Sequence, residues 1–154
     1  EKSPVITTPD TPFVIGRAEI FRTPPAGGDV AIVACGILVY NALMAAEELS
    51  REGIECIVVN NHTIKPMDEK TIAAVARQAG AVVTAEEHQI AGGMGSAVAE
   101  VLARNHPVPQ EFVGMQDRFG ESGDPYELIE AFGMGVGAIK EAVKKVIARK
   151  KAVL

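Results

Sequence analysis

The sequence has few aromatic residues, only two cysteines and no excess of basic residues, and each shortage restricts what the protein can be. Phenylalanine, tyrosine and tryptophan make up 5% of the 154 residues, and tryptophan is absent. Two cysteines at this spacing cannot form a structural zinc site, so we expect free thiols in a reducing compartment. The net charge of −5 gives no general attraction to nucleic acid or to anionic membranes.

Long apolar runs are missing as well, and nothing resembles a signal peptide or a membrane span, so we expect a cytoplasmic protein. Hydrophobic residues nevertheless make up 47% of the chain, mainly as alanine, valine and isoleucine. That composition is typical of helices packed on a parallel sheet within one domain. The one basic cluster is expected to be the cationic last turn of a helix, and it comprises Lys144, Lys145, Arg149, Lys150 and Lys151.

Apolar stretches and helical periodicities alternate along the chain. Buried strands are expected at residues 29–35, 54–59, 81–85 and 108–113, with helices at 39–51, 68–78, 93–104, 125–132 and 138–151. A short edge strand or hairpin is expected before them, within residues 13–21. This alternation predicts an α/β fold, a three-layer α/β/α arrangement with a mostly parallel sheet of about five strands.

Polar residues gather where the predicted strands end. Cys35 and Gly36 follow the first buried strand, and residues 60–63, 86–89 and 116–123 follow the next three. In a parallel sheet these turns lie at the carboxyl edge, where ligands and partner domains bind. The candidate site or interface residues at this edge are His62, Glu87, His88 and Arg118.

Each of these side chains also has a simpler interpretation. His62 can form a hydrogen bond within its own turn. Glu86 and Glu87 are adjacent, so on a strand end they point in opposite directions and do not form an acid/base pair. One of them is expected to cap the next helix or to bind Arg118, and the other to be solvated. Arg118 can equally hold a carboxylate of its own domain.

The glycine-rich stretch at residues 92–97 follows a strand and opens a helix, as a dinucleotide-binding loop does. Its glycine spacing differs from that motif, and no acidic residue ends a following strand at the required distance. Close packing of helix and strand is the better interpretation. The sequence also lacks a Walker loop, a nucleophile elbow, an HExxH motif and the thiamine-diphosphate signature. The residues alone therefore predict no self-contained active site.

Four segments, taken in order, resemble the C-terminal domain of transketolases, particularly those made as two separate chains. They are residues 29–36, 61–68, 86–100 and 117–123, and the resemblance extends over about residues 13–150. The β subunits of 2-oxoacid dehydrogenases and deoxyxylulose-phosphate synthase have a related domain. Those families usually carry arginine at the position of His62 and lack a stretch like residues 119–123, so the resemblance favours transketolase.

The resemblance implies a part of an enzyme that transfers a two-carbon ketol unit between sugar phosphates, as in the pentose phosphate pathway. Thiamine diphosphate and magnesium would be bound by two other domains, and this domain would bind no cofactor. Residues 1–12, rich in proline and threonine, would be a linker from a preceding aminopyrimidine-binding domain, and residues 13–154 the C-terminal domain. Its partners would be those cofactor-binding domains, in the same or a separate chain, within a homodimer.

The resemblance also implies a role for one candidate residue. In deoxyxylulose-phosphate synthase the arginine at this position reaches the substrate phosphate, so His62 is expected to contact phosphorylated sugars here. Two alternatives stay open at this point. One is the same domain in a 2-oxoacid dehydrogenase, docking an acyltransferase core. The other is a freestanding module that binds an anion or a nucleotide.

Overall fold

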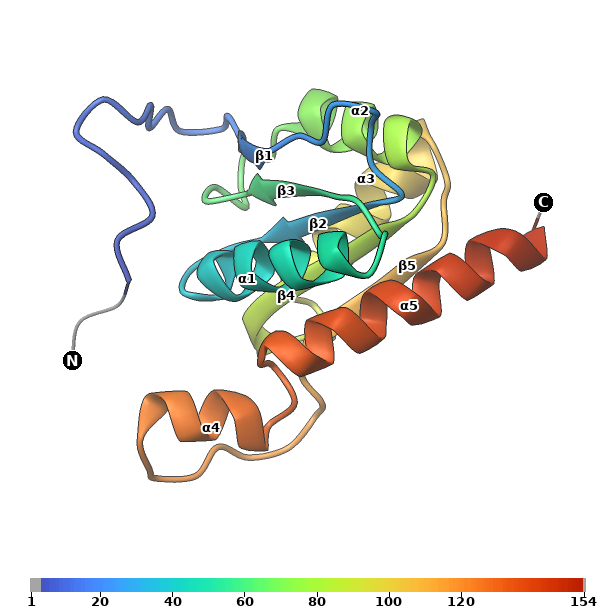
Figure 1. The fold of residues 1–154 in the computed structure, drawn as a ribbon. Coiled ribbons are helices and arrows are strands. Elements are labelled where there is room, and N and C mark those ends of the chain that lie inside the picture. Colours follow the sequence, from blue (N-terminus) through green and yellow to red (C-terminus); the bar gives the residue numbers. More distant parts are fainter. Residues whose placement is uncertain (1–3, 154) are drawn as a thin grey trace.

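The computed structural model describes residues 4–153 and contains a five-stranded sheet between two layers of helices (Figure 1). The strand order is β1-β3-β2-β4-β5. The strands are β1 (Glu19–Arg22), β2 (Val30–Ala34), β3 (Cys56–Asn60), β4 (Val82–Gln89) and β5 (Gln110–Met115). The predicted three-layer fold with about five strands is confirmed.

The central strand β2 is the most deeply placed element of the sheet, because all five of its residues are buried. It pairs in parallel with β3 on one side and with β4 on the other, and β5 extends the parallel part beyond β4. Only β1 runs antiparallel, along the outer edge of β3. Strands that are covered on both faces consist of continuous apolar residues, which is why β2, β3 and the first half of β4 are visible in the sequence. Strand β5 is only partly buried, and it begins and ends two residues later than the strand predicted at 108–113.

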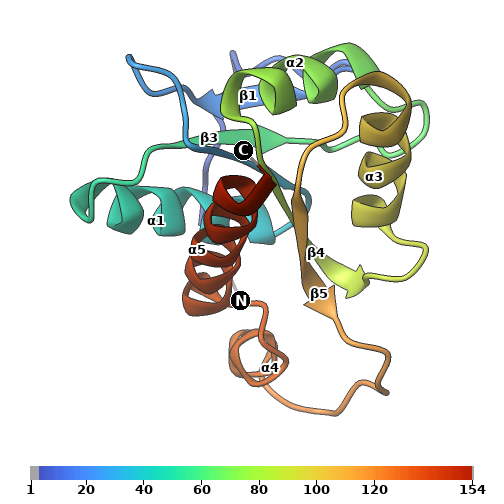
Figure 2. The same ribbon diagram turned by 90° about the vertical axis from the view of Figure 1, so that its right-hand side faces the viewer.

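Helices α1 (Leu38–Arg51) and α5 (Val136–Val153) cover one face of the sheet, and α2 (Glu69–Ala79) and α3 (Met94–Asn105) cover the other (Figures 1 and 2). Each face has its own apolar core cluster. The short helix α4 (Pro125–Ala131) lies below the sheet in these views, and its Ile129 joins the core cluster of the α1/α5 face. Within residues 4–153, no helix combines the length and hydrophobicity needed to span a bilayer.

The helix ends follow the signals in the sequence. The side chain of Asp68 accepts a hydrogen bond from the Thr71 N–H at the start of α2, and Gly80 ends that helix with a φ of 67°. Asp124 accepts from the N–H groups of Tyr126 and Glu127 at the start of α4. These polar and glycine residues fix where each helix begins and ends, and thereby where the turns at the carboxyl edge lie.

The basic residues of α5 form ion pairs with other elements, in addition to any interaction with their own helix dipole. Lys145 and Arg149 both contact Glu111 of β5. Lys150 donates hydrogen bonds to the carbonyl oxygens of Asp29 and Ala79. The cluster therefore attaches the last helix to the sheet, and it is not a free basic surface.

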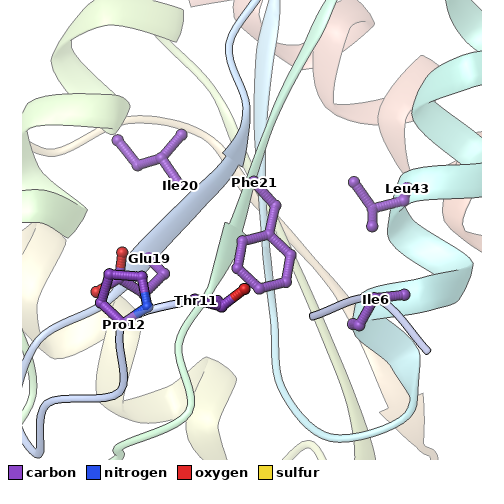
Figure 3. A pocket seen from close by; sticks show the side chains of 7 residues that line it. All are labelled: Ile6, Thr11, Pro12, Glu19, Ile20, Phe21 and Leu43. Atoms are coloured by element: carbon purple, nitrogen blue, oxygen red, sulfur yellow. The ribbon is translucent and has the colours of Figure 1, made fainter. Parts of the chain in front are cut away.

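The N-terminal segment, residues 4–18, has no helix or strand and loops out at the left of the domain before it enters β1 (Figure 1). Ile6 packs against the core cluster of the α1/α5 face, so this part of the predicted linker contacts the domain. Residues 1–3 of that linker lie outside the described residues. Between the segment and the domain is a cavity of about 330 Å³, shown in Figure 3 and lined by Ile6, Thr11, Pro12, Glu19, Ile20, Phe21 and Leu43.

Candidate functional site

The predicted site residues lie along one edge of the sheet. His62 follows β3, Glu87 and His88 are in the last turn of β4, and Arg118 follows β5. The strand order places β2 between β3 and β4, so His62 and Arg118 are three strands apart. Neighbouring strands are about 4.8 Å apart, which separates these two positions by roughly 14 Å. The four residues form a row, and they do not converge on a single pocket.

His62 is held by the adjacent Thr63 and by Phe13 of the N-terminal segment. Its Nδ1 lies 2.9 Å from the Oγ1 of Thr63, as the simpler interpretation predicted. The ring stacks on Phe13 of the N-terminal segment, with 4.2 Å between ring centroids. Its Nε2 is shielded from solvent and has no hydrogen-bond partner among the described residues. The ring is therefore fixed in orientation while one nitrogen keeps an unused hydrogen-bonding capacity.

Asn61 is a second polar residue at the end of β3, and sequence reasoning did not single it out. Its side chain is 1% exposed, and neither its amide oxygen nor its amide nitrogen has a partner among the described residues. A buried amide without partners costs free energy, so this residue type is unfavourable for stability alone. The sequence feature that could have pointed to Asn61 is its position close behind a continuous apolar strand.

Glu86 and Glu87 have the opposite orientations that their adjacency predicts. The Glu86 carboxylate is buried and accepts hydrogen bonds from the N–H groups of Met94 (2.6 Å) and Gly95 (2.8 Å) at the start of α3. Glu87 is exposed. Strand β4 continues through both residues to Gln89, four positions beyond the predicted strand end at Ala85. Glu86 is thus a capping residue of α3, and only Glu87 faces the outside of the edge.

The glycine-rich stretch is explained by the same carboxylate. A Cβ at Gly93 would collide with Glu86 and with the carbonyl oxygen of Gln89, and a Cβ at Gly95 would collide with Thr84 and Phe112. The N–H groups that would bind a phosphate in a dinucleotide loop already bond to Glu86. Close packing of helix and strand, as predicted, is the reason for these glycines.

Cys35 lies at the end of β2, between the two neighbouring strand ends. Ala34 pairs with Asn60 and Ala85, so the next residue, Cys35, lies between Asn61 and Glu86. Burial raises the pKa of the Cys35 thiol to about 11, and the negative charges of Glu86 and Glu87 add to that shift. The thiol is half-buried and stays protonated at neutral pH, so it is not a nucleophile.

Arg118 interacts within its own domain. Its guanidinium forms an ion pair with Glu121 (2.9 Å) and lies 4.4 Å above the ring of Phe132. The Gln89 side chain fixes the adjacent backbone, since its oxygen accepts from the Asp117 N–H (3.0 Å) and its amide group donates to the Arg118 carbonyl oxygen (3.2 Å). Sequence reasoning missed this role of Gln89, because a side chain that bonds to a loop 28 residues away leaves no local pattern.

Known proteins agree with this architecture. The family model described as "Transketolase, C-terminal domain" matches residues 16–139. The chain belongs to the transketolase C-terminal domain family. The 6-deoxy-6-sulfo-D-fructose transketolase subunit SqwH of Clostridium sp. (strain MSTE9) is 48% identical over 138 residues, which cover 90% of this chain and 42% of that protein. The 1-deoxy-D-xylulose-5-phosphate synthase of Desulforudis audaxviator (strain MP104C) is 42% identical, over 81% of this chain and 20% of that enzyme.

Solved structures show the same relationship for this transketolase C-terminal domain. A chain of the structure titled "Split gene transketolase, inactive beta4 tetramer" superposes with a TM-score of 0.88 at 43% identity, covering 96% of this chain and 47% of that one. The transketolase of Campylobacter jejuni subsp. jejuni NCTC 11168 shares the fold at 22% identity, with a TM-score of 0.63 and coverage of 90% and 20%. The chain thus spans less than half the length of these relatives.

Among the described residues of the transketolase C-terminal domain, the His, Cys, Asp and Glu side chains are not grouped as a site for a metal ion. At the start of α3, the N–H groups of Met94 and Gly95 could otherwise bind a diphosphate, but they donate to the Glu86 carboxylate. The cavity of Figure 3 lies at β1 and α1, and Glu19 is the only charged residue among those that line it.

Proposed function

We propose that this chain is the C-terminal domain of a transketolase-type enzyme that transfers a two-carbon ketol unit between sugar phosphates. In this proposal the domain supplies packing, a dimer contact and a contact to the substrate phosphate. Thiamine diphosphate and magnesium are bound by other domains, in the same or a separate chain. Residues 1–12 are the linker from an aminopyrimidine-binding domain, and residues 13–154 form the domain itself.

The observation that carries the proposed substrate contact is the state of His62. Its ring is fixed by Phe13 and Thr63, and its Nε2 has no partner among the described residues. The Nε2 of His62 can donate a hydrogen bond to a phosphate oxygen from either the neutral or the charged imidazole. A sugar sulfonate has a similar anionic end, and one relative is named as a transketolase subunit for 6-deoxy-6-sulfo-D-fructose.

The test uses the complete enzyme that contains this chain, assayed with thiamine diphosphate and magnesium. His62→Ala is expected to raise KM for phosphorylated sugars by about tenfold, because one charge-assisted hydrogen bond is lost. KM for unphosphorylated sugars should stay within about twofold of the wild-type value. His106→Ala is the matched control, since it removes a histidine at the C-terminal end of α3, outside the row of candidate residues.

Equal effects of His62→Ala on both sugar classes would overturn the phosphate contact. The reaction itself is tested in parallel with pyruvate and glyceraldehyde 3-phosphate, because deoxyxylulose-phosphate synthases are 40–42% identical to this chain. Condensation of that pair without ketol transfer would identify a synthase. Absence of both activities in the complete enzyme would contradict the transketolase assignment.

A further inference from the structure

The loop after β5 presents a phenylalanine to solvent. Phe119 is 96% exposed, and all residues from 116 to 127 are exposed. An aromatic side chain removes roughly 150–250 Å² from water when it is buried, which makes it one of the strongest contributors to interfaces. The other large apolar side chains of the carboxyl edge are more covered, including Phe13, which stacks on His62.

A few specific contacts restrain the loop that carries Phe119. Gln89 forms two hydrogen bonds with its backbone, at Asp117 and at Arg118. Asp117 has a φ of 48°, in the left-handed region, so the chain turns sharply there. Arg118 is fixed between Glu121 and Phe132. A side chain presented on a pre-ordered loop loses little conformational freedom when it binds.

We propose that Phe119 is the anchor of a docking loop, residues 116–123, that inserts into an apolar socket on the cofactor-binding portion of the same enzyme. This inference rests on the proposed function. The relatives contain more chain than this domain, which covers 42% and 47% of two of them. The docking loop lies at the same edge as His62 and Glu87, and the row at that edge is incomplete as a site without further protein.

The charged residues around the docking loop indicate which charge the rim of the socket should carry. Acidic residues occur on both sides of Phe119 in the sequence and continue into α4, and the exposed ones are Asp117, Glu121, Asp124, Glu127 and Glu130. Arg118 is the one basic side chain within the docking loop, and it is already paired with Glu121. The socket is therefore an apolar pocket with basic residues at its rim, because opposite charges at the rim speed association and suppress wrong partners.

Cysteine labelling tests whether Phe119 is covered on assembly. Both native thiols have a raised pKa and are partly or fully buried, so a cysteine placed at position 119 reacts selectively. Alkylation of Phe119→Cys is measured on this chain alone and after mixing with the cofactor-binding portion. We expect at least tenfold slower labelling in the mixture. Lys70→Cys, on exposed α2, is the control and should react at the same rate in both states.

Affinity measurements complete the test. Phe119→Asp is expected to weaken binding of the cofactor-binding portion by at least tenfold, whereas Phe119→Leu retains an apolar anchor and stays within about threefold of wild type. Circular dichroism should be unchanged in both variants, because the side chain contacts little of its own domain.

Each outcome separates the inference from the function on which it rests. Wild-type association that is unaffected by Phe119→Asp, with no protection of position 119, would overturn the docking loop and leave the proposed function standing. If the wild-type chain does not associate with the cofactor-binding portion, the proposed function is overturned, and so is the proposal that this portion binds the docking loop. If position 119 is already protected in the chain alone, and more so at higher chain concentration, then a second copy of the chain covers Phe119. That result would also overturn the proposal.

Discussion

The two cysteines differ in position but share an environment that suppresses their chemistry. Burial raises the pKa of Cys35 to about 11 and that of Cys56 to about 12. At pH 8 a thiol with a pKa of about 11 is ionised in about one molecule in a thousand. Since the thiolate is the reactive form, neither residue is suited to nucleophilic or redox catalysis.

We therefore predict that both thiols in the native chain react with iodoacetamide at pH 8 at least about a hundredfold more slowly than in the urea-unfolded chain. Mass spectrometry of labelled peptides measures each site separately. The raised pKa values of the two thiols also determine how the stability of the fold depends on pH. The thiols favour the folded state below their unfolded pKa near 9, and this contribution is lost as the pH rises toward 11. Rapid native labelling of Cys35 would show that the carboxyl edge opens.

At the scale of elements, the start of α3 depends on a carboxylate from a neighbouring strand. The helix has no side-chain cap from its own N-cap residue, Gly93. Glu86 replaces that cap by accepting from two N–H groups of the first turn. Because the carboxylate is charged and the helix start carries partial positive charge, these hydrogen bonds are stronger than those of a neutral cap.

Glu86→Ala is expected to lower the free energy of unfolding by about 3 kcal/mol, since two hydrogen bonds to a charged group are lost and two buried N–H groups are left without partners. Glu87→Ala, one residue further on, should change it by less than about 0.5 kcal/mol, because that side chain is exposed. Urea denaturation of both variants gives the comparison. Similar losses in the two variants would show that Glu86 does not act as the cap of α3.

The elements themselves could largely be predicted from the sequence. Continuous apolar runs identified β2, β3 and the start of β4, and Asp68, Gly80 and Asp124 marked helix ends where the structure has them. The predicted β5 was shifted by two residues, because its sequence mixes polar and apolar side chains. The end of β4 was predicted four residues too early. Its last residues are polar, and they continue the strand because Gln89 pairs with Met115 of β5 beyond an irregularity in the register. That pairing is a tertiary contact, and it has no local signal.

The edge on which the candidate residues lie was predictable from the sequence, and their arrangement along it was not. The sequence placed His62, Glu87 and Arg118 on one edge, because carboxyl ends of parallel strands share an edge. It could not order them, since the strand order, with β2 between β3 and β4, depends on how the helices pack. The stack of Phe13 on His62 joins residues 49 positions apart, and the exposure of Phe119 follows from the loop conformation.

For the whole molecule, stability is expected to be greatest at the centre of the sheet and least in the docking loop. Strand β2 is buried throughout and paired on both sides. The docking loop is exposed and is held by few hydrogen bonds. Amides of deeply buried, doubly paired strands exchange only on global unfolding, whereas loop amides exchange through local opening.

Hydrogen–deuterium exchange is therefore predicted to protect residues 30–34 by at least about a thousandfold more than residues 118–123. Peptide-level mass spectrometry resolves both segments. Adding the cofactor-binding portion should slow exchange of the docking loop and leave β2 unchanged. Comparable protection of the two segments in the chain alone would mean that the docking loop is already covered, for example by a second copy.

The central position of β2 has a consequence for synthesis of the protein. This strand leaves the ribosome first among the parallel strands, yet Ala34 pairs with Ala85, which is translated about fifty residues later. At about 5–20 residues per second, the β4 side of this apolar strand stays unpaired for several seconds, even after β3 has been made. Such a segment is a ready substrate for chaperones that bind short extended hydrophobic peptides. The strand that contributes most to the finished core is thus the one most exposed to aggregation while the protein is being made.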